Sequence, residues 1–342
     1  MTPLATVSLV DVASYLPENR VPTSYFTQYA KTDRMAKNIM FRAPTWRHHV
    51  AADETAVDMA ERAMAPLIER HGAAEVLGVD ILLTHTQLPD LPVLGCGSEV
   101  AKRMGMNPGW ILDVHNGGCA SFPYMIQLAQ MIMSTTTARS ALIVAVQNAA
   151  GQGMTQTEVR KLAQATIPGD GCGVGLLRKS DEAPVLGVLA RNYPEFAGDM
   201  TGEVEPARKY WEPGEGQWRI AFTEAKIMKV FARGNRLVPE VATALCDELG
   251  IKPSTVDTFV TNQPNRLFLR NWGDALELPA ERHPDTFDEC GNLFGAGIPI
   301  TLDIENQAGR IKNGSFVLMS AFAHAGDFAA AAAVQWGAEP KL

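Results

Sequence analysis

The sequence predicts an α/β fold in which helices cover both faces of the sheets. Five short apolar runs are typical of buried strands, and they span residues 79–84, 141–146, 173–177, 256–260 and 315–319. Longer stretches with helical apolar spacing lie between them, including residues 54–70 and 221–249. Strands that alternate with helices in this way are typical of layered α/β proteins.

An internal repeat indicates that this fold is duplicated. Three pairs of segments resemble each other in the same order: 79–90 (VDILLTHTQLPD) with 256–267 (VDTFVTNQPNRL), 139–146 (RSALIVAV) with 313–320 (NGSFVLMS), and 168–177 (PGDGCGVGLL) with 325–334 (AGDFAAAAAV). The shared order predicts two halves with one topology. A polar, proline-containing stretch at 179–184 (KSDEAP) separates them, so the predicted halves are residues 1–180 and 181–342.

Composition excludes several classes of function. The net charge is −8 and no run of Lys or Arg is present, so we expect no nucleic-acid binding. No apolar run reaches the roughly 18 residues of a membrane span, and the N-terminus lacks the features of a signal peptide. The five cysteines include no CxxC pair, which predicts neither a zinc site nor a disulfide framework. A cytoplasmic, metal-free protein is expected.

The stretch from residue 194 to residue 218 (PEFAGDMTGEVEPARKYWEPGEGQW) is predicted to be a long loop. It is rich in Gly, Pro, Glu and Trp and contains no regular apolar pattern. Loops of this length in compact domains often bind ligands, so we interpret the stretch as a binding loop or lid.

Cys119 is the first candidate for chemistry. It follows two glycines, Gly117 and Gly118, which allow close backbone approach or a positive φ. A segment with helical spacing, residues 121–133, comes directly after it. The positive end of a helix dipole lowers the pKa of a thiol, which favours a nucleophile. A buried core cysteine is the alternative reading of the same pattern.

Four motifs resemble the thiolase superfamily, most closely its β-ketoacyl-ACP synthase III type. They are ETAVDMAERA (54–63), DVHNGGCASFPYMIQLA (113–129), PGDGCGVGLL (168–177) and GNLFGAGIPITLD (291–303). The resemblance implies a thiolase-like fold, a five-layer αβαβα architecture with pseudo-twofold halves, and a homodimer. It also implies that Cys119 accepts an acyl group from acyl-CoA or an acyl carrier protein. CoA or phosphopantetheine then serves as the substrate carrier, and no other cofactor is expected.

The second catalytic motif departs from the family pattern. The family reads HQAN, whereas this sequence reads NQPN from Asn262 to Asn265. Asn262 stands where the family has a histidine, and an amide can donate a hydrogen bond but cannot titrate near neutral pH. The resemblance assigns the family's later catalytic asparagine to Asn292. By the same resemblance, Asn265 matches an asparagine that contacts the pantetheine arm.

Three further residues are assigned to substrate binding. Phe294 lies in the GNLFGAGIPITLD motif next to Asn292. Trp46 and Arg47 lie in a region that, in the family, helps to hold the adenine and phosphates of CoA. An aromatic ring beside a cation suits such a ligand. A solvated surface patch is the alternative for this pair.

A loop near the C-terminus has gained two groups that titrate. The family has a glycine-rich turn, AFGGGFTWG, that helps to form an oxyanion hole, and this chain reads AFAHAGDF at 321–328. His324 is interpreted as a displaced base or as a donor to a substrate carbonyl. Asp327 would orient a histidine or accept a proton; alternatively, it is a turn residue like its repeat partner Asp170. Some related natural-product acyltransferases use Cys, His and Asp, and the resemblance places Asp327 where such an aspartate would lie. Their histidine has no counterpart here, because its position falls near Asn292.

Two other histidines are interpreted as structural. His85 is equivalent to Asn262 in the repeat, and pseudo-twofold symmetry would bring both positions toward the centre. His115 is expected to lie in the strand that leads to Cys119. Imidazole nitrogens find backbone partners easily, which favours the structural reading of both.

Three functions are consistent with these residues. The first is an acyltransferase that moves an acyl group from Cys119 to a hydroxyl or amine acceptor in secondary metabolism. The second is Claisen condensation with a malonyl or other carbon-nucleophile thioester. The third is a silent partner subunit in a synthase heterodimer, against which the presence of Cys119 counts. We favour the first.

Overall fold

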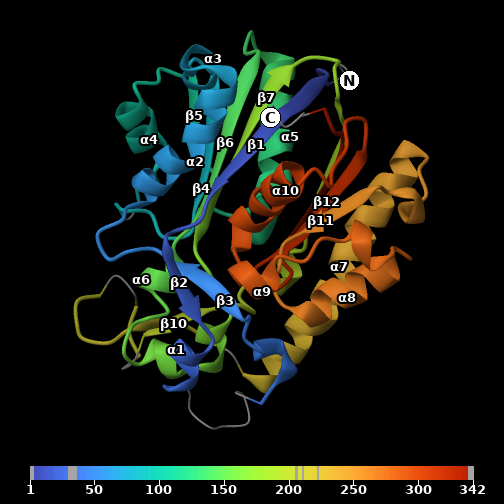
Figure 1. The fold of residues 1–342 in the computed structure, drawn as a ribbon. Coiled ribbons are helices and arrows are strands. Elements are labelled where there is room, and N and C mark those ends of the chain that lie inside the picture. The colour runs from blue at the N-terminus through green and yellow to red at the C-terminus, as the bar shows by residue number, and fades with distance from the viewer. Residues whose placement is uncertain are drawn as a thin grey trace.

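The computed structural model describes residues 4–29, 37–91, 93–204, 207–209, 212–221 and 223–337 (Figure 1). Its first sheet has the order β1-β7-β6-β4-β5. These strands are β1 (Val7–Tyr15), β7 (Gly171–Lys179), β6 (Ser140–Gln147), β4 (Ile81–Thr86) and β5 (Trp110–Asp113). Strand β4 runs parallel to β5 and β6, whereas β7 runs antiparallel to β6 and β1.

The second sheet repeats this arrangement. Its order is β11-β12-β13-β8, from β11 (Thr258–Thr261), β12 (Phe316–Ala323), β13 (Phe328–Gln335) and β8 (Val185–Asn192). Strands β11 and β12 are parallel, and β13 runs antiparallel to both β12 and β8. The run β11-β12-β13-β8 therefore has the topology of β4-β6-β7-β1, which confirms the predicted duplication. The first sheet has the additional strand β5 at its edge.

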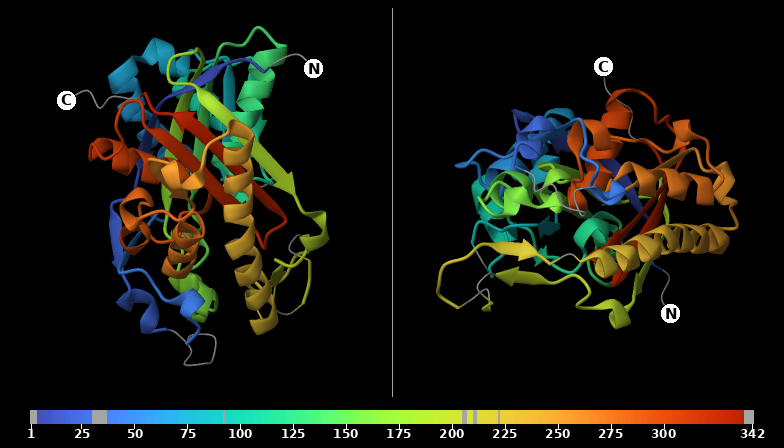
Figure 2. Two further views of the ribbon diagram at one scale, coloured as in Figure 1. Left: turned by 90° about the vertical axis from the view of Figure 1, so that its right-hand side faces the viewer. Right: turned by 90° about the horizontal axis from the view of Figure 1, so that it is seen from below.

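Helices complete a five-layer sandwich (Figures 1 and 2). The central layer contains α5 (Ser121–Thr135) and α10 (Gly297–Gln307), whose apolar residues share one core with both sheets. One outer layer comprises α2 (Ala56–His71), α3 (Ala73–Leu77) and α4 (Gly97–Met104). The opposite outer layer comprises α7 (Glu224–Leu249) and α8 (Arg266–Ala275). The predicted αβαβα order is confirmed.

The local sequence explains where the outer helices begin and end. Thr55 caps α2 by accepting a hydrogen bond from the Asp58 backbone N–H (3.1 Å), and the Asp58 carboxylate accepts one from the Thr55 N–H (2.9 Å). Thr223 caps α7 by accepting a hydrogen bond from the Lys226 backbone N–H (3.2 Å), and Gly250 ends that helix with a φ of 69°. Residue 222 of the predicted helix at 221–249 lies outside the described residues.

The predicted loop at 194–218 contains short elements. Strands β9 (Gly202–Val204) and β10 (Trp218–Ile220) pair antiparallel. Their pairing lays the Trp218 indole against Gly202, where no side chain would fit. Residues 205, 206, 210 and 211 of this stretch lie outside the described residues. The remaining elements are β2 (Asn19–Pro22), β3 (Trp46–His49), α1 (Ser24–Thr27), α6 (Ala149–Gln152) and α9 (Phe287–Cys290).

The described helices were compared with the length and hydropathy of a membrane span. Among the residues described above, no helix has the length and apolar character needed to cross a bilayer.

Candidate active site

The two central helices start beside each other. Cys119 lies in the 3₁₀ turn η2 (Gly118–Ala120), immediately before α5. The turn η8 (Phe294–Ala296) leads into α10 and contacts η2. Because free N–H groups and the positive ends of helix dipoles occur at helix starts, this junction is suited to stabilise negative charge. The duplicated fold thus places Cys119 where the two halves meet.

Glycines allow this close approach. Gly118 has a φ of 48°, and a Cβ there would lie 2.9 Å from the Ala323 Cβ and 3.2 Å from Nε2 of His324. A Cβ on Gly295 would lie 2.6 Å from both His85 Cδ2 and Ser121 Oγ. Cβ contacts this short are not tolerated in packed proteins. The predicted role of a glycine before the nucleophile, a positive φ with close approach, is confirmed at Gly118.

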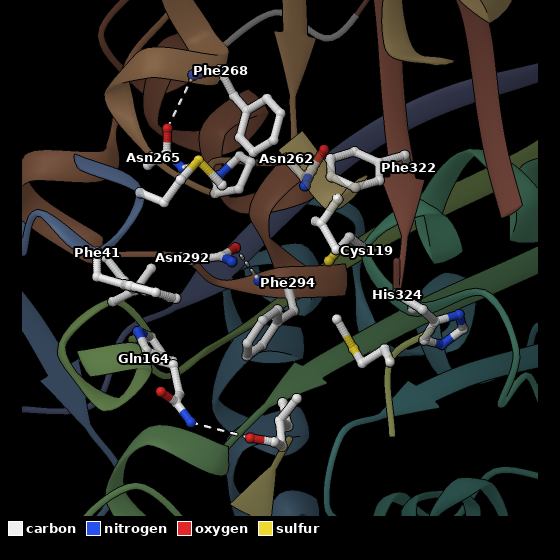
Figure 3. Close-up of a pocket in the computed structure, with 18 of the residues that line it drawn as sticks. Phe41, Cys119, Gln164, Asn262, Asn265, Phe268, Asn292, Phe294, Phe322 and His324 are labelled. Carbon is white, nitrogen blue, oxygen red and sulfur yellow. Dashed lines mark hydrogen bonds between the residues drawn. The ribbon is translucent and has the colours of Figure 1, made fainter. Parts of the chain in front are cut away.

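A cavity opens at this junction (Figure 3). Six of the predicted site residues line it: Cys119, Asn262, Asn265, Asn292, Phe294 and His324. Much of the remaining wall is apolar and includes Met40, Phe41, Met200, Ile227, Phe268 and Phe322. The cavity therefore combines a few convergent polar groups with an apolar lining, which is the usual character of a small-molecule site.

The thiol of Cys119 is protonated at rest. Burial raises its pKa to about 12, and smaller lowering effects come from its own backbone N–H and from a hydrogen bond with the Asn262 side chain. The expectation that the dipole of the following helix gives a low thiol pKa is therefore wrong, because desolvation of the thiolate outweighs it. Attack by Cys119 consequently requires a base.

The two asparagines present different faces to the cavity. Asn292 Oδ1 accepts a hydrogen bond from the Phe294 N–H (3.0 Å), so its amide nitrogen is the group it can offer to a ligand. Asn262 is 1% exposed and follows β11, and its Oδ1 has no partner among the described residues. An unpartnered buried acceptor beside Cys119 favours a ligand that carries an N–H or O–H group.

His324 and Asp327 form a hydrogen-bonded pair in the turn between β12 and β13. His324 Nδ1 lies 2.8 Å from Asp327 Oδ1. Because a carboxylate only accepts, Nδ1 carries a proton, and in the neutral form of the ring Nε2 then has the lone pair. Nε2 is also the ring atom that lies against Gly118, next to Cys119. The pair thus has the arrangement of a general base and its orienting carboxylate.

Asn265 has a clear structural contribution as well as a place on the cavity wall. Its Oδ1 accepts hydrogen bonds from the N–H groups of Leu267 and Phe268, both at 3.0 Å, and so caps α8. Its Nδ2 lies 3.5 Å from the sulfur of Met40, another wall residue. Contact between Asn265 and a substrate stays a prediction.

The structure places Trp46 and Arg47 away from the cavity. Arg47 is fully buried, donates to the Thr166 carbonyl and stacks 4.4 Å above the Phe26 ring. Burial lowers its pKa to about 10. Trp46 stacks with Arg20 at 4.4 Å. A buried guanidinium cannot meet a phosphate at the surface, so the assignment of Arg47 to CoA binding is corrected to a structural role. Trp46 is half-buried and does not line the cavity, and its contact with CoA stays a prediction.

The two histidines that were predicted to be structural, His85 and His115, differ in burial. His85 is the penultimate residue of β4, and its Nδ1 lies 2.8 Å from the Val114 carbonyl, as expected for a structural histidine. Burial lowers its pKa to about 4, so the ring is neutral at pH 7. His115 is exposed and follows β5 (Trp110–Asp113). The expectation that it lies within the strand was wrong.

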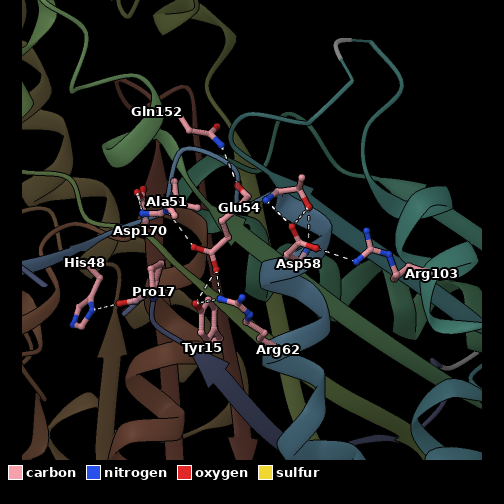
Figure 4. A network of polar contacts seen from close by, with 12 residues as sticks. Tyr15, Pro17, His48, Ala51, Glu54, Asp58, Arg62, Arg103, Gln152 and Asp170 are labelled. Carbon is pink, nitrogen blue, oxygen red and sulfur yellow. Dashed lines mark hydrogen bonds and ion pairs between the residues drawn. The ribbon is translucent and has the colours of Figure 1, made fainter. Parts of the chain in front are cut away.

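The aspartate of the GDG turn differs from its repeat partner Asp327. Asp170 is fully buried and accepts hydrogen bonds from the N–H groups of Val50 (2.9 Å), Ala150 (2.7 Å) and Gly151 (2.6 Å). Figure 4 shows it beside the bonded side chains of Glu54 and its neighbours. Asp170 is thus committed to backbone groups, whereas the Asp327 side chain is bonded to an imidazole.

Most of the apolar wall and both of its glutamines were not identified from the sequence. Gln87 and Gln164 line the cavity, and the Gln164 side chain also donates to the Ile220 carbonyl (3.1 Å). No local pattern distinguishes these glutamines from surface residues. Met200 belongs to the stretch predicted to be a binding loop, so the composition of that stretch was the available signal.

A duplicated five-layer fold with a cysteine at the start of a central helix defines the thiolase class of proteins. The sequence model described as 3-oxoacyl-[acyl-carrier-protein (ACP)] synthase III matches residues 112–193, and the model of its C-terminal part matches residues 246–336. Together they match about half of the chain. The chain belongs to the thiolase superfamily, as a protein similar to β-ketoacyl-ACP synthase III.

Individual relatives agree with this placement. β-Ketoacyl-[acyl-carrier-protein] synthase III of Alkalilimnicola ehrlichii is 28% identical over 81% of this chain and 84% of its own length. Synthase III from Thermus thermophilus has a TM-score of 0.82 at 24% identity, covering 96% of this chain and 99% of that chain. The priming β-ketosynthase of the R1128 polyketide pathway has a TM-score of 0.84 at 20% identity, covering 99% of both chains. These two solved structures support the fold.

Proposed function

We propose that the protein is an acyltransferase that works through an acyl-Cys119 thioester. The donor is an acyl-CoA or an acyl carrier protein, and the acceptor is a hydroxyl or amine of a small molecule in secondary metabolism. The observation that carries the proposal is the His324–Asp327 hydrogen bond, because it holds a base in the cavity that contains Cys119. Such a base suits transfer to an acceptor that loses a proton when it attacks.

The first half of the reaction charges Cys119. His324 Nε2 takes the thiol proton, and the sulfur attacks the thioester carbonyl of the donor. Backbone N–H groups at the helix junction and the amide of Asn292 stabilise the negative oxygen. The donor thiolate then leaves and takes the proton from His324. A base is needed because the pKa of Cys119 is raised to about 12.

The second half moves the acyl group to the acceptor. The acceptor O–H or N–H donates to the free Oδ1 of Asn262 or to Nε2 of His324. His324 removes the acceptor proton, the acceptor oxygen or nitrogen attacks the acyl carbonyl, and the Cys119 sulfur leaves with the proton from His324. Asp327 stabilises the imidazolium that forms between these events.

Condensation is the second candidate, and the names of the relatives favour it. Proteins called synthase III are similar to most of this chain. Asn262 and Asn292 both line the cavity, and both amides would donate to a thioester carbonyl. Asn262 cannot supply the titratable ring of the family's HQAN motif, which is why we place acyl transfer first.

Intact-mass spectrometry separates the candidates. Wild type and Cys119→Ala are incubated with a panel of acyl-CoA thioesters and acyl carrier proteins. A mass gain on wild type alone supports the acyl-enzyme, and no gain with any donor favours a silent partner subunit. Malonyl thioester is then added to the acylated protein. Release of carbon dioxide with a new C–C bond would move the assignment to condensation, whereas transfer to hydroxylamine without carbon dioxide supports the acyltransferase.

Assembly as a homodimer is also proposed. Strand β5 forms the edge of the first sheet, and it exposes Trp110 (44%) and Ile111 (37%). An exposed apolar edge strand is a template for pairing with another copy. Pairing of β5 with its equivalent in a second chain would cover both side chains.

A further inference from the structure

One arginine that does not line the cavity contacts two segments that each contribute a residue to its wall. Arg233 lies on α7 (Glu224–Leu249), and its Nη1 lies 2.5 Å from Asp199 Oδ2. The same nitrogen donates to the Ala325 carbonyl at 3.2 Å. The guanidinium also stacks 3.8 Å from the centre of the Phe196 ring. Arg233 therefore contacts residues 196–199 on one side and the turn between β12 and β13 on the other.

The arginine side of these contacts is largely shielded from water, whereas the Asp199 side chain is 27% exposed. The Arg233 side chain is 14% exposed, and Gly326 packs against its aliphatic stem, where a Cβ would lie 3.1 Å from the Arg233 Cβ and Cδ. Gly326 has a φ of 103°, so the turn needs glycine at this point for conformation as well as for space. The hydrogen bond from Arg233 lowers the pKa of the Asp199 carboxyl. A charge pair that is shielded and also bonded to a backbone carbonyl is stronger than an exposed pair.

Two of the three contacts of Arg233 lie one residue from the cavity wall. Asp199 precedes Met200, and Ala325 follows His324, and both of these neighbours line the cavity. His324 itself has a φ of 50°, a conformation that a non-glycine residue adopts only when its surroundings hold it there. The Ala325 carbonyl is the backbone group through which Arg233 holds this turn.

We propose that Arg233 is a positioning residue that sets the His324–Asp327 pair when the 194–204 segment lies closed over the cavity. Phe196 and Asp199 anchor the segment to the guanidinium, and the guanidinium in turn fixes the turn that carries His324. Loss of the contacts to the 194–204 segment would therefore loosen the turn that carries His324, and loss of the contact to the turn would loosen the segment. The effect on rate rests on the proposed acyltransferase function, whereas the effect on the geometry of His324 does not.

The kinetic test compares Arg233→Met with Arg233→Lys, using Arg236→Met as the matched control. Arg236 lies on the same helix, is 59% exposed and approaches Glu240 at 3.9 Å. Transfer from acylated enzyme to hydroxylamine is expected to slow at least about tenfold in Arg233→Met, with acylation of Cys119 changed less than about threefold. Arg233→Lys should recover part of the loss, because a lysine keeps a positive charge for Asp199 but lacks the planar guanidinium that stacks on the Phe196 ring.

The structural test reads His324 directly. Nitrogen NMR of the imidazole in wild type should show one neutral tautomer with the proton on Nδ1, and Asp199→Asn and Arg233→Met should both shift it toward a mixture. An unchanged tautomer and an unchanged transfer rate in Arg233→Met would overturn the proposal. If wild type takes up no acyl group, the acyltransferase function fails, and the NMR result still decides whether Arg233 positions His324. Arg233→Lys and Asp199→Asn serve if Arg233→Met does not fold.

Discussion

His324 Nδ1 lies 2.8 Å from Asp327 Oδ1 within a single turn of the chain. The turn is held at both ends, since Tyr193 N–H donates to the Asp327 carbonyl at 2.7 Å and Gly326 N–H donates to the Ala323 carbonyl at 2.9 Å. The imidazole is therefore oriented by a neighbour three residues away. A base can be moved into the cavity by substitutions in this one turn, independently of the NQPN segment.

The first prediction concerns the orienting carboxylate. Asp327→Asn keeps the shape of the side chain but removes the charge that stabilises an imidazolium. We expect the transfer of the acyl group from Cys119 to slow by about 10²-fold or more, because general-base catalysis contributes on that order. Rapid-quench mass spectrometry measures the step. Asp181→Asn, at an exposed position, is the control, and equal rates for the two variants would contradict the role of Asp327.

The second prediction concerns the pH dependence of the nucleophile. Burial raises the pKa of Cys119 to about 12, so the thiolate fraction is small at pH 7 and grows about tenfold for each pH unit. Alkylation by iodoacetamide is expected to accelerate continuously from pH 7 to pH 10. Cys119→Ser should remove the label, because the other four cysteines are buried. A plateau below pH 8 would show a thiolate stabilised at rest.

The fold was largely predictable because duplication leaves a pattern in apolar runs. The five predicted strands correspond to β4, β6, β7, β11 and β12, with ends that differ by a few residues. The pairing of β9 and β10 was not predictable from local sequence, since each strand has only three residues. It depends on contacts such as Trp218 against Gly202, which arise only once the chain is folded.

The identity of several site residues was predictable, because their residue types carry the chemistry. Properties that depend on burial, such as the pKa of a side chain, were less predictable. Cys119, Asn262, Asn292 and His324 do converge on one cavity. The state of the Cys119 thiol was not predictable, because local sequence shows the helix that follows but not the depth at which the sulfur lies. The predicted role of Arg47 in CoA binding was wrong for the same reason, because Arg47 is buried by residues far from it in the sequence, such as Phe26 and Thr166.

The third prediction restores the titratable ring of the family motif. Asn262→His places an imidazole beside Cys119, where Asn262 is 1% exposed and hydrogen-bonded to the thiol. We expect at least about tenfold faster release of carbon dioxide from malonyl thioester, since a titratable donor then faces the thioester. Labelled carbon dioxide provides the measurement. Asn262→Gln keeps an amide and should not gain this activity; if both variants behave alike, the missing ring is not what limits decarboxylation.

The fourth prediction concerns assembly. Trp110→Glu places a charge on the exposed edge strand β5, where Trp110 is 44% exposed. A charge on a pairing edge disfavours strand addition, so the variant should sediment as a monomer while wild type sediments as a dimer. Trp218→Glu, at a similarly exposed tryptophan (45%) on β10, is the control and should remain dimeric. A monomeric wild type at micromolar concentration would exclude the homodimer.

The fifth prediction tests the junction of the central helices. Gly295→Ala would set a methyl group 2.6 Å from both His85 Cδ2 and Ser121 Oγ, in a region with no free space. We expect a loss of about 1–3 kcal/mol in the free energy of unfolding, and at least about tenfold slower acylation of Cys119 as η2 shifts. Gly109→Ala is the matched control, because its nearest neighbour would be the Asp80 carbonyl oxygen at 3.8 Å. It should stay within about 0.5 kcal/mol of wild type. Urea titrations measure the free energy of unfolding, and intact-mass kinetics measure the acylation rate. If Gly295→Ala acylates at the wild-type rate, the contact between η2 and η8 does not position the nucleophile.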